Sequence, residues 1–365
     1  MIYRFIAVSL GAVVLASAAA AYKGPPSEIV QPAAPQPAPP KKAAYCEGAQ
    51  SEQAYRACMQ RIAAARKATK RKKAPPPITA DTLNARGSHH ARKADYDRAI
   101  ADYTRAVRKD SRHHDAYNNR GLAHLAKGDM ERAIADYSFA IGIKPREATH
   151  YNARAWAYLA AGKAELGLKD ADRALTLRPK FADALHTRGR LLLALGRGDA
   201  AIADFDRAIA INPKYAAAFN SRGLAWDARQ AHDRAIADYT QAIKLWARYD
   251  DAYNNRAASY AAKGDTERAV ADYAKAIAIA PSEPLHYNAR AWVYLQAGKA
   301  DAALADADKA LALAPRFAHA LDTRGHIHEA LGRREQAIAD YTQAVALDTS
   351  IAGSREGLKR LGAPR

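Results

Sequence analysis

The residues best suited to chemistry in this sequence are arginines and aspartates that recur at a constant interval. From Arg86 every 34th residue is Arg, and from Asp102 every 34th residue is Asp, eight times in each case. A guanidinium and a carboxylate form paired, charge-assisted hydrogen bonds. Either the arginines form a ladder for an acidic ligand, or each arginine pairs with the next aspartate of the series and fixes the register of packing. The equal numbers of opposite charges favour structural pairs such as Arg120–Asp136, Arg154–Asp170 and Arg256–Asp272.

Other residue types form no pattern typical of catalysis or metal binding. The 12 histidines are scattered, and neighbouring ones are adjacent or two apart, whereas metal sites on helices need spacings of three or four. The sequence contains no phosphate-binding loop, nucleophile elbow, HExxH motif or dinucleotide fingerprint. We therefore expect no catalytic residue, metal, cofactor or small-molecule substrate. An enzyme is the weaker hypothesis, which a deep pocket with clustered acids would revive.

The constant interval defines eight tandem repeats over residues 80–351, numbered here from position 1 at Ala80. Position 8 is always Gly or Ala, position 27 is always Ala, and position 4 is always large and apolar. Apolar residues at positions 4, 8 and 11 share one face of a first helix, and those at 20, 24 and 27 share one face of a second. Glycine at position 15 in six repeats and proline at position 32 in five separate the helices.

These features resemble the tetratricopeptide repeat family. The resemblance implies an all-α fold: a right-handed superhelical solenoid of helix-turn-helix repeats, closed by a capping segment at residues 352–365. The sequence departs from the family pattern at position 7, where Arg replaces an apolar residue, and in repeats 1, 5 and 8, which lack Pro at position 32. Repeats 1 to 4 resemble repeats 5 to 8 in order, which indicates a duplicated block of four.

The resemblance implies that the first helix of each repeat lines a concave groove that binds a protein or peptide. Position 5 supplies a row of mostly amide side chains, which would bond the backbone of an extended peptide or remain solvated or locally bonded: Asn84, Asn118, Asn152, His186, Asn220, Asn254 and Asn288, with Asp322 last. Trp156 and Trp292 at position 9 would stack on a ligand, or fill the volume left by Ala171 and Ala307 at position 24. No repeat has Lys at position 2 or 5, so the family's clamp for acidic chaperone tails is not expected.

Residues 1–79 form a leader of different composition. Residues 1–21 resemble a secretory signal, with Arg4, an uncharged run over 5–21, and small residues at Ala19 and Ala21 before a cleavage point. The alternative is an uncleaved anchor in the inner membrane. Residues 22–44 are a proline-rich linker, which favours an extended chain. We expect an exported protein of bacterial type, located in the periplasm or secreted.

Residues 45–79 predict a basic helical segment that ends at Pro75. The two cysteines, Cys46 and Cys58, favour a disulfide in an exported protein, with two free thiols as the alternative. A basic cluster follows them: Arg66, Lys67, Lys70, Arg71, Lys72 and Lys73. It would bind an anionic envelope polymer or lipid, with nucleic acid less favoured, or serve as a solvated tether.

Charge separates two hypotheses for function. The chain has a net charge of +18, and residues 1–79 alone carry 12 basic residues against three glutamates. The favoured hypothesis is a scaffold or adaptor of the cell envelope that holds a protein or peptide segment in the groove of the repeats. The second hypothesis is a polyanion binder that acts through the leader, with the solenoid as a spacer.

Overall fold

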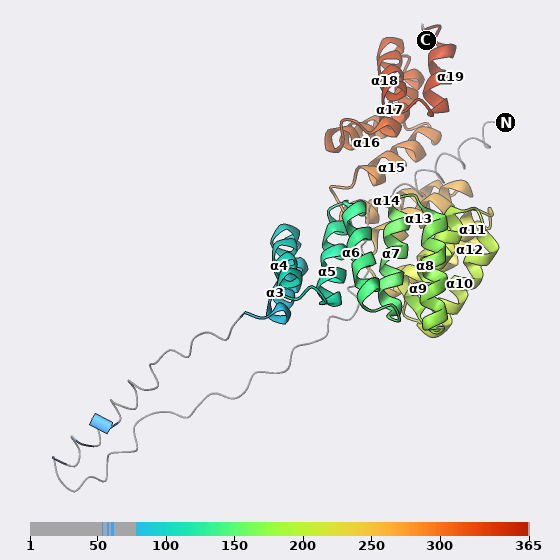
Figure 1. Cartoon of the computed structure of the whole chain (residues 1–365). Coiled ribbons are helices and arrows are strands. Elements are labelled where there is room, and N and C mark those ends of the chain that lie inside the picture. The colour runs from blue at the N-terminus through green and yellow to red at the C-terminus, as the bar shows by residue number, and fades with distance from the viewer. Residues whose placement is uncertain (1–52, 54–56, 58–59, 62–77, 364–365) are drawn as a thin grey trace. The chain divides into compact units, whose positions relative to one another are not determined.

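The computed structural model describes residues 53, 57, 60–61 and 78–363 and contains helices but no strand over that part of the chain (Figure 1). Residues 53, 57, 60 and 61 of the leader are helical. The predicted signal segment, the proline-rich linker, Cys46, Cys58 and the basic cluster from Arg66 to Lys73 lie outside the described residues. None of the described helices is both long enough and apolar enough to cross a membrane.

The described helices fall into two compact units, divided after Pro145. The N-terminal unit contains α3 (Ala80–Arg92), α4 (Tyr96–Lys109), α5 (His114–Ala126) and α6 (Met130–Ile143). The C-terminal unit contains α7 (Ala148–Ala160), α8 (Ala164–Leu177), α9 (Ala182–Ala194), α10 (Gly198–Ile211), α11 (Ala216–Asp227), α12 (His232–Leu245), α13 (Asp250–Ala262), α14 (Thr266–Ile279), α15 (Pro284–Gln296), α16 (Ala300–Leu313), α17 (Ala318–Ala330), α18 (Arg334–Leu347) and α19 (Ala352–Arg360).

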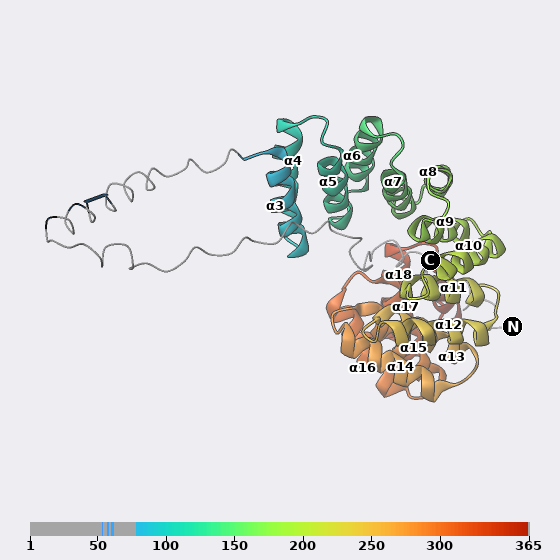
Figure 2. The same cartoon turned by 90° about the horizontal axis from the view of Figure 1, so that it is seen from below.

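Each predicted repeat is a pair of antiparallel helices, and the successive pairs of the C-terminal unit follow a curved path (Figure 2). In both units, each helix packs most extensively on its partner within the repeat. Within a unit, the second helix of a repeat packs next on the first helix of the following repeat. The predicted fold class, an all-α solenoid of helix-turn-helix repeats, is therefore confirmed.

The turn between the two helices of a repeat needs one residue with left-handed backbone. Gly264 has a φ of 80°, and the same position is glycine in six repeats. Repeats 1 and 5 place Ala94 and Gln230 there, at φ angles of 57° and 60°. Repeats 1 and 5 thus form the same left-handed turn without glycine. The strain falls on Ala94 and Gln230, whose Cβ atoms are crowded against the backbone.

The two helices of a repeat approach closely because position 8 is small. In repeat 5 a Cβ atom on Gly223 would lie 2.6 Å from the ring of Tyr239, the residue at position 24. Tyr239 is fully buried, and its equivalents Tyr103, Tyr137, Phe205, Tyr273 and Tyr341 are buried too. The ring at position 24 therefore forms the core of most repeats.

Repeats 3 and 7 have alanine instead of a ring at position 24, and a side chain of the following repeat fills the space. Ala171 packs with Leu191, and Ala307 packs with Ile327. Leu191 and Ile327 occupy position 10 of the following repeats, and both are completely buried. The apolar clusters around Ala171 and Ala307 contain neither Trp156 nor Trp292.

The last helix, α19, packs on repeat 8 as the first helix of a ninth repeat would. Ser354 donates a hydrogen bond to Asp322 Oδ1 at 2.6 Å. Arg360 binds the Glu329 carboxylate through Nε and Nη2, at 3.0 and 2.8 Å. The predicted C-terminal segment thus covers the end of the array, as a solenoid requires.

Candidate functional site

The arginine and aspartate columns form one ion pair inside every repeat. Arg120 donates from Nε and Nη2 to the two carboxylate oxygens of Asp136, at 2.8 and 2.6 Å, and the other seven pairs repeat this fork. The aspartates are buried, and the hydrogen bonds that Arg120 donates to Asp136 raise the pKa of Arg120 above its ordinary value. The pairs Arg154–Asp170 and Arg256–Asp272 share this geometry.

The same arginines also bridge successive repeats, which the sequence analysis did not anticipate. In five repeats Nη1 donates to an oxygen at position 25 of the preceding repeat: Arg120 to Thr104, Arg188 to Asp172, Arg222 to Asp206, Arg256 to Thr240 and Arg324 to Asp308. The sequence signal was available, because position 25 is Thr, Ser or Asp in every repeat except the sixth. In these five repeats all three nitrogens of the guanidinium therefore donate a hydrogen bond within the solenoid.

Most of the residues at position 5 are engaged with the next repeat. Asn84 Oδ1 accepts a hydrogen bond from Asn119 Nδ2 at 3.0 Å, and Asn220 Oδ1 accepts one from Asn255 Nδ2 at 3.1 Å. Asn254 Oδ1 lies 3.1 Å from the Nδ1 of buried His286. These amides tie neighbouring first helices together, and Asn118 likewise has polar contacts.

His186 takes the same role with an imidazole ring. Its Nε2 lies 2.9 Å from Ser221 Oγ of the next repeat, and its Nδ1 lies 3.2 Å from Tyr215 Oη. Burial lowers the pKa of His186 to about 3, so the ring is neutral at physiological pH.

Asn152 and Asn288 differ from the rest of the row. Their Oδ1 atoms are buried, and neither has a hydrogen-bond partner among the described residues. They occupy the same position in repeats 3 and 7, which correspond in the duplicated block. Each lies four residues before a tryptophan, and residues four apart share one face of a helix. The structure therefore places Asn152 beside Trp156, and Asn288 beside Trp292, on the first helices of these repeats.

The two tryptophans are half-buried among polar rings and cations. The guanidinium of Arg190 lies 4.6 Å from the ring centroid of Trp156, a cation–π contact, and His186 stacks on the same ring at 6.4 Å. Trp292 contacts His326 edge-on at 5.6 Å. Both tryptophans therefore lie next to position 9 of the following repeat, which carries Arg190 or His326.

A polar network around Asp227 also escaped the sequence analysis. The carboxylate accepts hydrogen bonds from Tyr239 Oη at 2.8 Å and Ser259 Oγ at 2.7 Å, and His232 Nδ1 lies 2.9 Å from it. Burial raises the pKa of Asp227. Because Ser259 donates to the carboxylate and not to the imidazole, these residues do not form the relay of a serine nucleophile. Among the described residues, no group of three or more His, Cys, Asp or Glu could hold a metal ion.

Family models match several stretches of the chain. Those described as tetratricopeptide repeat match residues 84–148, 250–283, 287–317 and 318–350, and one described as TPR repeat matches 189–226. Together these stretches cover more than half of the sequence. No curated protein matches the chain.

Solved structures show the same architecture. The structure titled as the APC/C hetero-tetramer Cut9-Hcn1 aligns with a TM-score of 0.62 at 15% identity, over 81% of this chain and 59% of that chain. This chain thus spans less than two thirds of that relative. A tetratricopeptide repeat protein from Parabacteroides merdae aligns with a TM-score of 0.56 at 23% identity, over 68% of this chain and 98% of that one. With the family matches and the paired helices, this likeness in fold shows that the chain belongs to the tetratricopeptide repeat family, whose repeats bind protein or peptide partners.

Proposed function

We propose that this protein is a scaffold of the cell envelope that holds an extended protein segment along the first helices of repeats 3 to 8. The proposal combines the family's role in protein interaction with the leader, whose sequence is typical of export. It places the protein in the periplasm or outside the cell, or bound to the inner membrane if the segment 5–21 is retained as an anchor.

The observation that carries the proposal is the pair of buried amide oxygens of Asn152 and Asn288. A buried acceptor without a donor costs about 1–3 kcal/mol, and the chain carries this cost at equivalent places in both halves of the array. An extended segment that displaces the side chains over these oxygens would relieve this cost with its backbone N–H groups. Such a segment would gain apolar contact from the adjacent tryptophan, a residue typical of interaction hot spots.

The remaining amides support this interpretation by contrast. Asn84, Asn220 and Asn254 already have partners in the neighbouring repeat. Their side chains therefore make the groove more rigid, and their Oδ1 atoms are less available to a ligand. The proposed contact points are therefore confined to repeats 3 and 7, the two that carry tryptophan at position 9. Two contact regions separated by four repeats suit a long extended segment better than a short peptide.

A pull-down with tagged full chain from an envelope extract tests the proposal, at physiological salt and with nuclease present. The test variant is W156A/W292A, and W246A is the control because Trp246 is 36% exposed in a loop between repeats. We expect the wild type and W246A to retain the same discrete protein and W156A/W292A to lose it. Equal retention by all three chains would show that the tryptophans take no part in binding.

The second candidate, polyanion binding by the leader, is favoured by the charge of residues 1–79. It predicts that the retained material is acidic and that moderate salt removes it, because each neutralised charge releases counterions. Binding to the groove, in contrast, should persist at physiological salt. Retention by the W156A/W292A variant that disappears with added salt would therefore favour the leader.

A further inference from the structure

The first repeat ends the described solenoid with an arginine whose outer side contacts no other repeat. In five later repeats Nη1 of the position 7 arginine donates to an oxygen of the preceding repeat. Arg86 has no preceding repeat. It binds Asp102 through Nε and Nη2, both at 2.6 Å, and its Nη1 has no partner among the described residues. The side chain of Arg86 is 45% exposed, whereas the other seven arginines of the column are 16–26% exposed.

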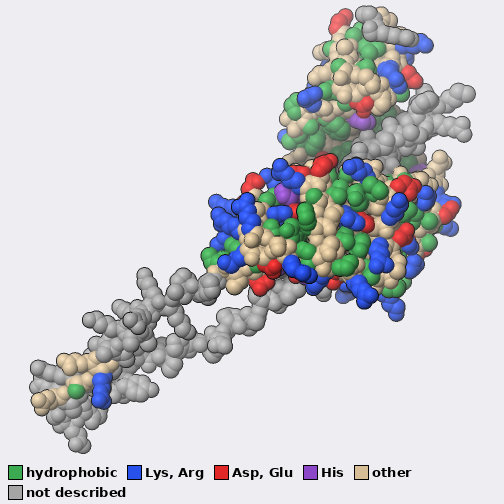
Figure 3. Space-filling view, viewed as in Figure 1, with side chains coloured by type: hydrophobic (Ala, Val, Ile, Leu, Met, Phe, Trp, Pro, Cys, Tyr) green, Lys and Arg blue, Asp and Glu red, His purple; other side chains and the backbone are tan. Residues whose placement is uncertain are grey.

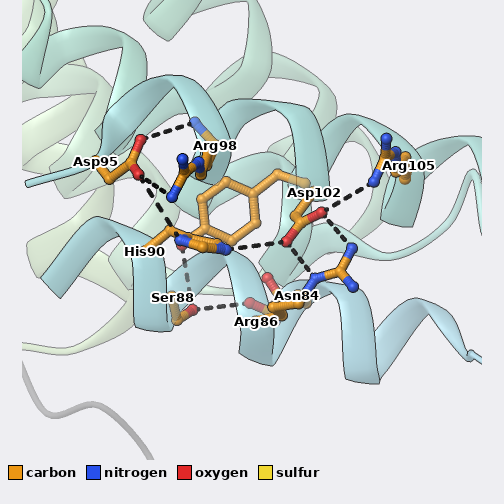
Figure 4. A network of polar contacts seen from close by, with 9 residues as sticks. Asn84, Arg86, Ser88, His90, Asp95, Arg98, Asp102 and Arg105 are labelled. Atoms are coloured by element: carbon orange, nitrogen blue, oxygen red, sulfur yellow. Dashed lines mark hydrogen bonds and ion pairs between the residues drawn. The ribbon is translucent and has the colours of Figure 1, made fainter. Parts of the chain in front are cut away.

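Two further arginines lie around this open side. Arg98 Nη1 is 3.4 Å from Asp95, and Arg105 Nη1 is 3.5 Å from Asp102, and the two arginine side chains are 75% and 64% exposed. With Arg86 they line an open pocket of about 350 Å³ on α3 and α4 (Figure 4). Figure 3 shows Lys and Arg side chains gathered over this end of the N-terminal unit.

The charges of the pocket do not cancel. Three guanidinium groups face two carboxylates, and the Asp102 carboxylate, 5% exposed, is already occupied by Arg86. His90 adds a ring whose nitrogens lie 4.0 Å from Asp95 and 3.8 Å from Asp102. Each exposed arginine uses one nitrogen for its aspartate and keeps further N–H donors for solvent or ligand.

We propose that this pocket binds a phosphoryl group, with Arg86, Arg98 and Arg105 as its donors. Planar guanidinium groups match the oxygens of a phosphate in forked, charge-assisted pairs. A phosphoryl group offers at least three acceptor oxygens, one for each arginine, and up to two negative charges, whereas a carboxylate offers two oxygens and one charge. Arg86 Nη1 would donate its hydrogen bond to an oxygen of the ligand, where the later arginines donate to an oxygen of the preceding repeat.

The leader is poor in acids that could fill this place. Residues 1–79 contain no aspartate and three glutamates against 12 basic residues. A second copy stacked end to end would have to present the position 25 oxygen of repeat 8, Thr342 Oγ, but α19 packs on α18 at that end of the array. An external anion is therefore the occupant that the charges favour.

Calorimetric titration of the full chain with pyrophosphate tests the proposal. The test variant is R98Q/R105Q, which removes two donors but keeps Arg86 on Asp102. The matched control is R132Q/R207Q, because Arg132 and Arg207 make the same contacts with Asp129 and Asp204 at 3.4 and 3.5 Å inside later repeats. Both variants lose two charges. We expect saturable binding by the wild type, a loss of at least about tenfold in affinity for R98Q/R105Q, and less than about twofold for the control.

Vesicles distinguish the two sources of a phosphoryl group. The same three chains are sedimented with two kinds of vesicle: pure phosphatidylcholine, and phosphatidylcholine that contains phosphatidylglycerol. The fraction of protein bound to each kind is compared. A loss of vesicle binding confined to R98Q/R105Q would assign the pocket to a lipid headgroup, and equal vesicle binding with selective loss of pyrophosphate would assign it to a soluble phosphoryl compound. No saturable binding of pyrophosphate by the wild type, or equal losses in both variants, would overturn the proposal.

Discussion

Arg222 Nη1 donates a hydrogen bond to Asp206 Oδ1 across the boundary between repeats 4 and 5, at 2.6 Å. The same guanidinium binds Asp238 inside its own repeat at 2.6 and 2.8 Å. One side chain therefore sets both the packing of two helices within a repeat and the position of the neighbouring repeat. In a solenoid, whose stability depends on repeats and their interfaces, such a residue contributes to both kinds of contact.

The two contacts of Arg222 should differ in energy. R222A leaves Asp238, whose side chain is 8% exposed, as a buried charge without a partner, which costs about 3–5 kcal/mol. D206A removes only the bond to an aspartate that is 53% exposed, which is worth about 0.2–1 kcal/mol. Urea unfolding followed by circular dichroism would measure both. If D206A lowered the free energy of unfolding as much as R222A, the two contacts of Arg222 would not differ in energy as expected.

The sequence predicted the parts of the fold that depend on period. The constant interval between repeats, the small residues at position 8 and the large ones at position 24 set the helix pairs, and the charge columns predicted Arg120–Asp136 and its equivalents. Contacts between repeats were harder to foresee, because they join positions that no single repeat contains. The bond from Arg188 to Asp172, the amide pair Asn84–Asn119 and the filling of the Ala171 site by Leu191 are all of this kind.

Replacing the two exposed non-glycine residues that have left-handed backbone should stabilise the protein. Ala94 and Gln230 adopt φ angles of 57° and 60°, which cost a residue with a Cβ atom about 1–2 kcal/mol. A94G and Q230G should each raise the free energy of unfolding by about 0.5–1 kcal/mol, since glycine also gains entropy in the unfolded chain. Gly264, at φ 80°, is the matched control, and G264A should destabilise by a similar amount. Denaturant midpoints of the three variants would check the signs.

Leu191 and Trp156 should separate stability from binding. Leu191 is completely buried against Ala171, so L191A leaves a cavity and should cost about 2–5 kcal/mol. Trp156 is half-buried and lies outside that cluster, so W156A should cost less stability but weaken capture of the partner. Thermal unfolding and the pull-down described above give both quantities. A larger loss of stability in W156A than in L191A would indicate that the tryptophan serves the core.

His186 should make the protein less stable in acid. Its pKa in the folded chain is about 3, whereas an unfolded histidine has a pKa near 6.5, so the unfolded chain binds more protons between these values. Stability therefore rises with pH across this window, is lost as the pH falls from about 6.5 towards 3, and does not depend on this group above about 6.5. Asn fills the same position in six other repeats, which makes H186N the suitable comparison.

The quantity to measure is the difference in unfolding midpoint between the wild type and H186N at pH 7, 5 and 4, because other groups titrate equally in both chains. The variant loses the contact with Tyr215, so we expect the wild type to be more stable at pH 7 and to lose this advantage progressively towards pH 4. An advantage that stays constant or grows as the pH falls would mean that the folded chain accepts a proton at His186, and that the ring is not held neutral between Ser221 and Tyr215.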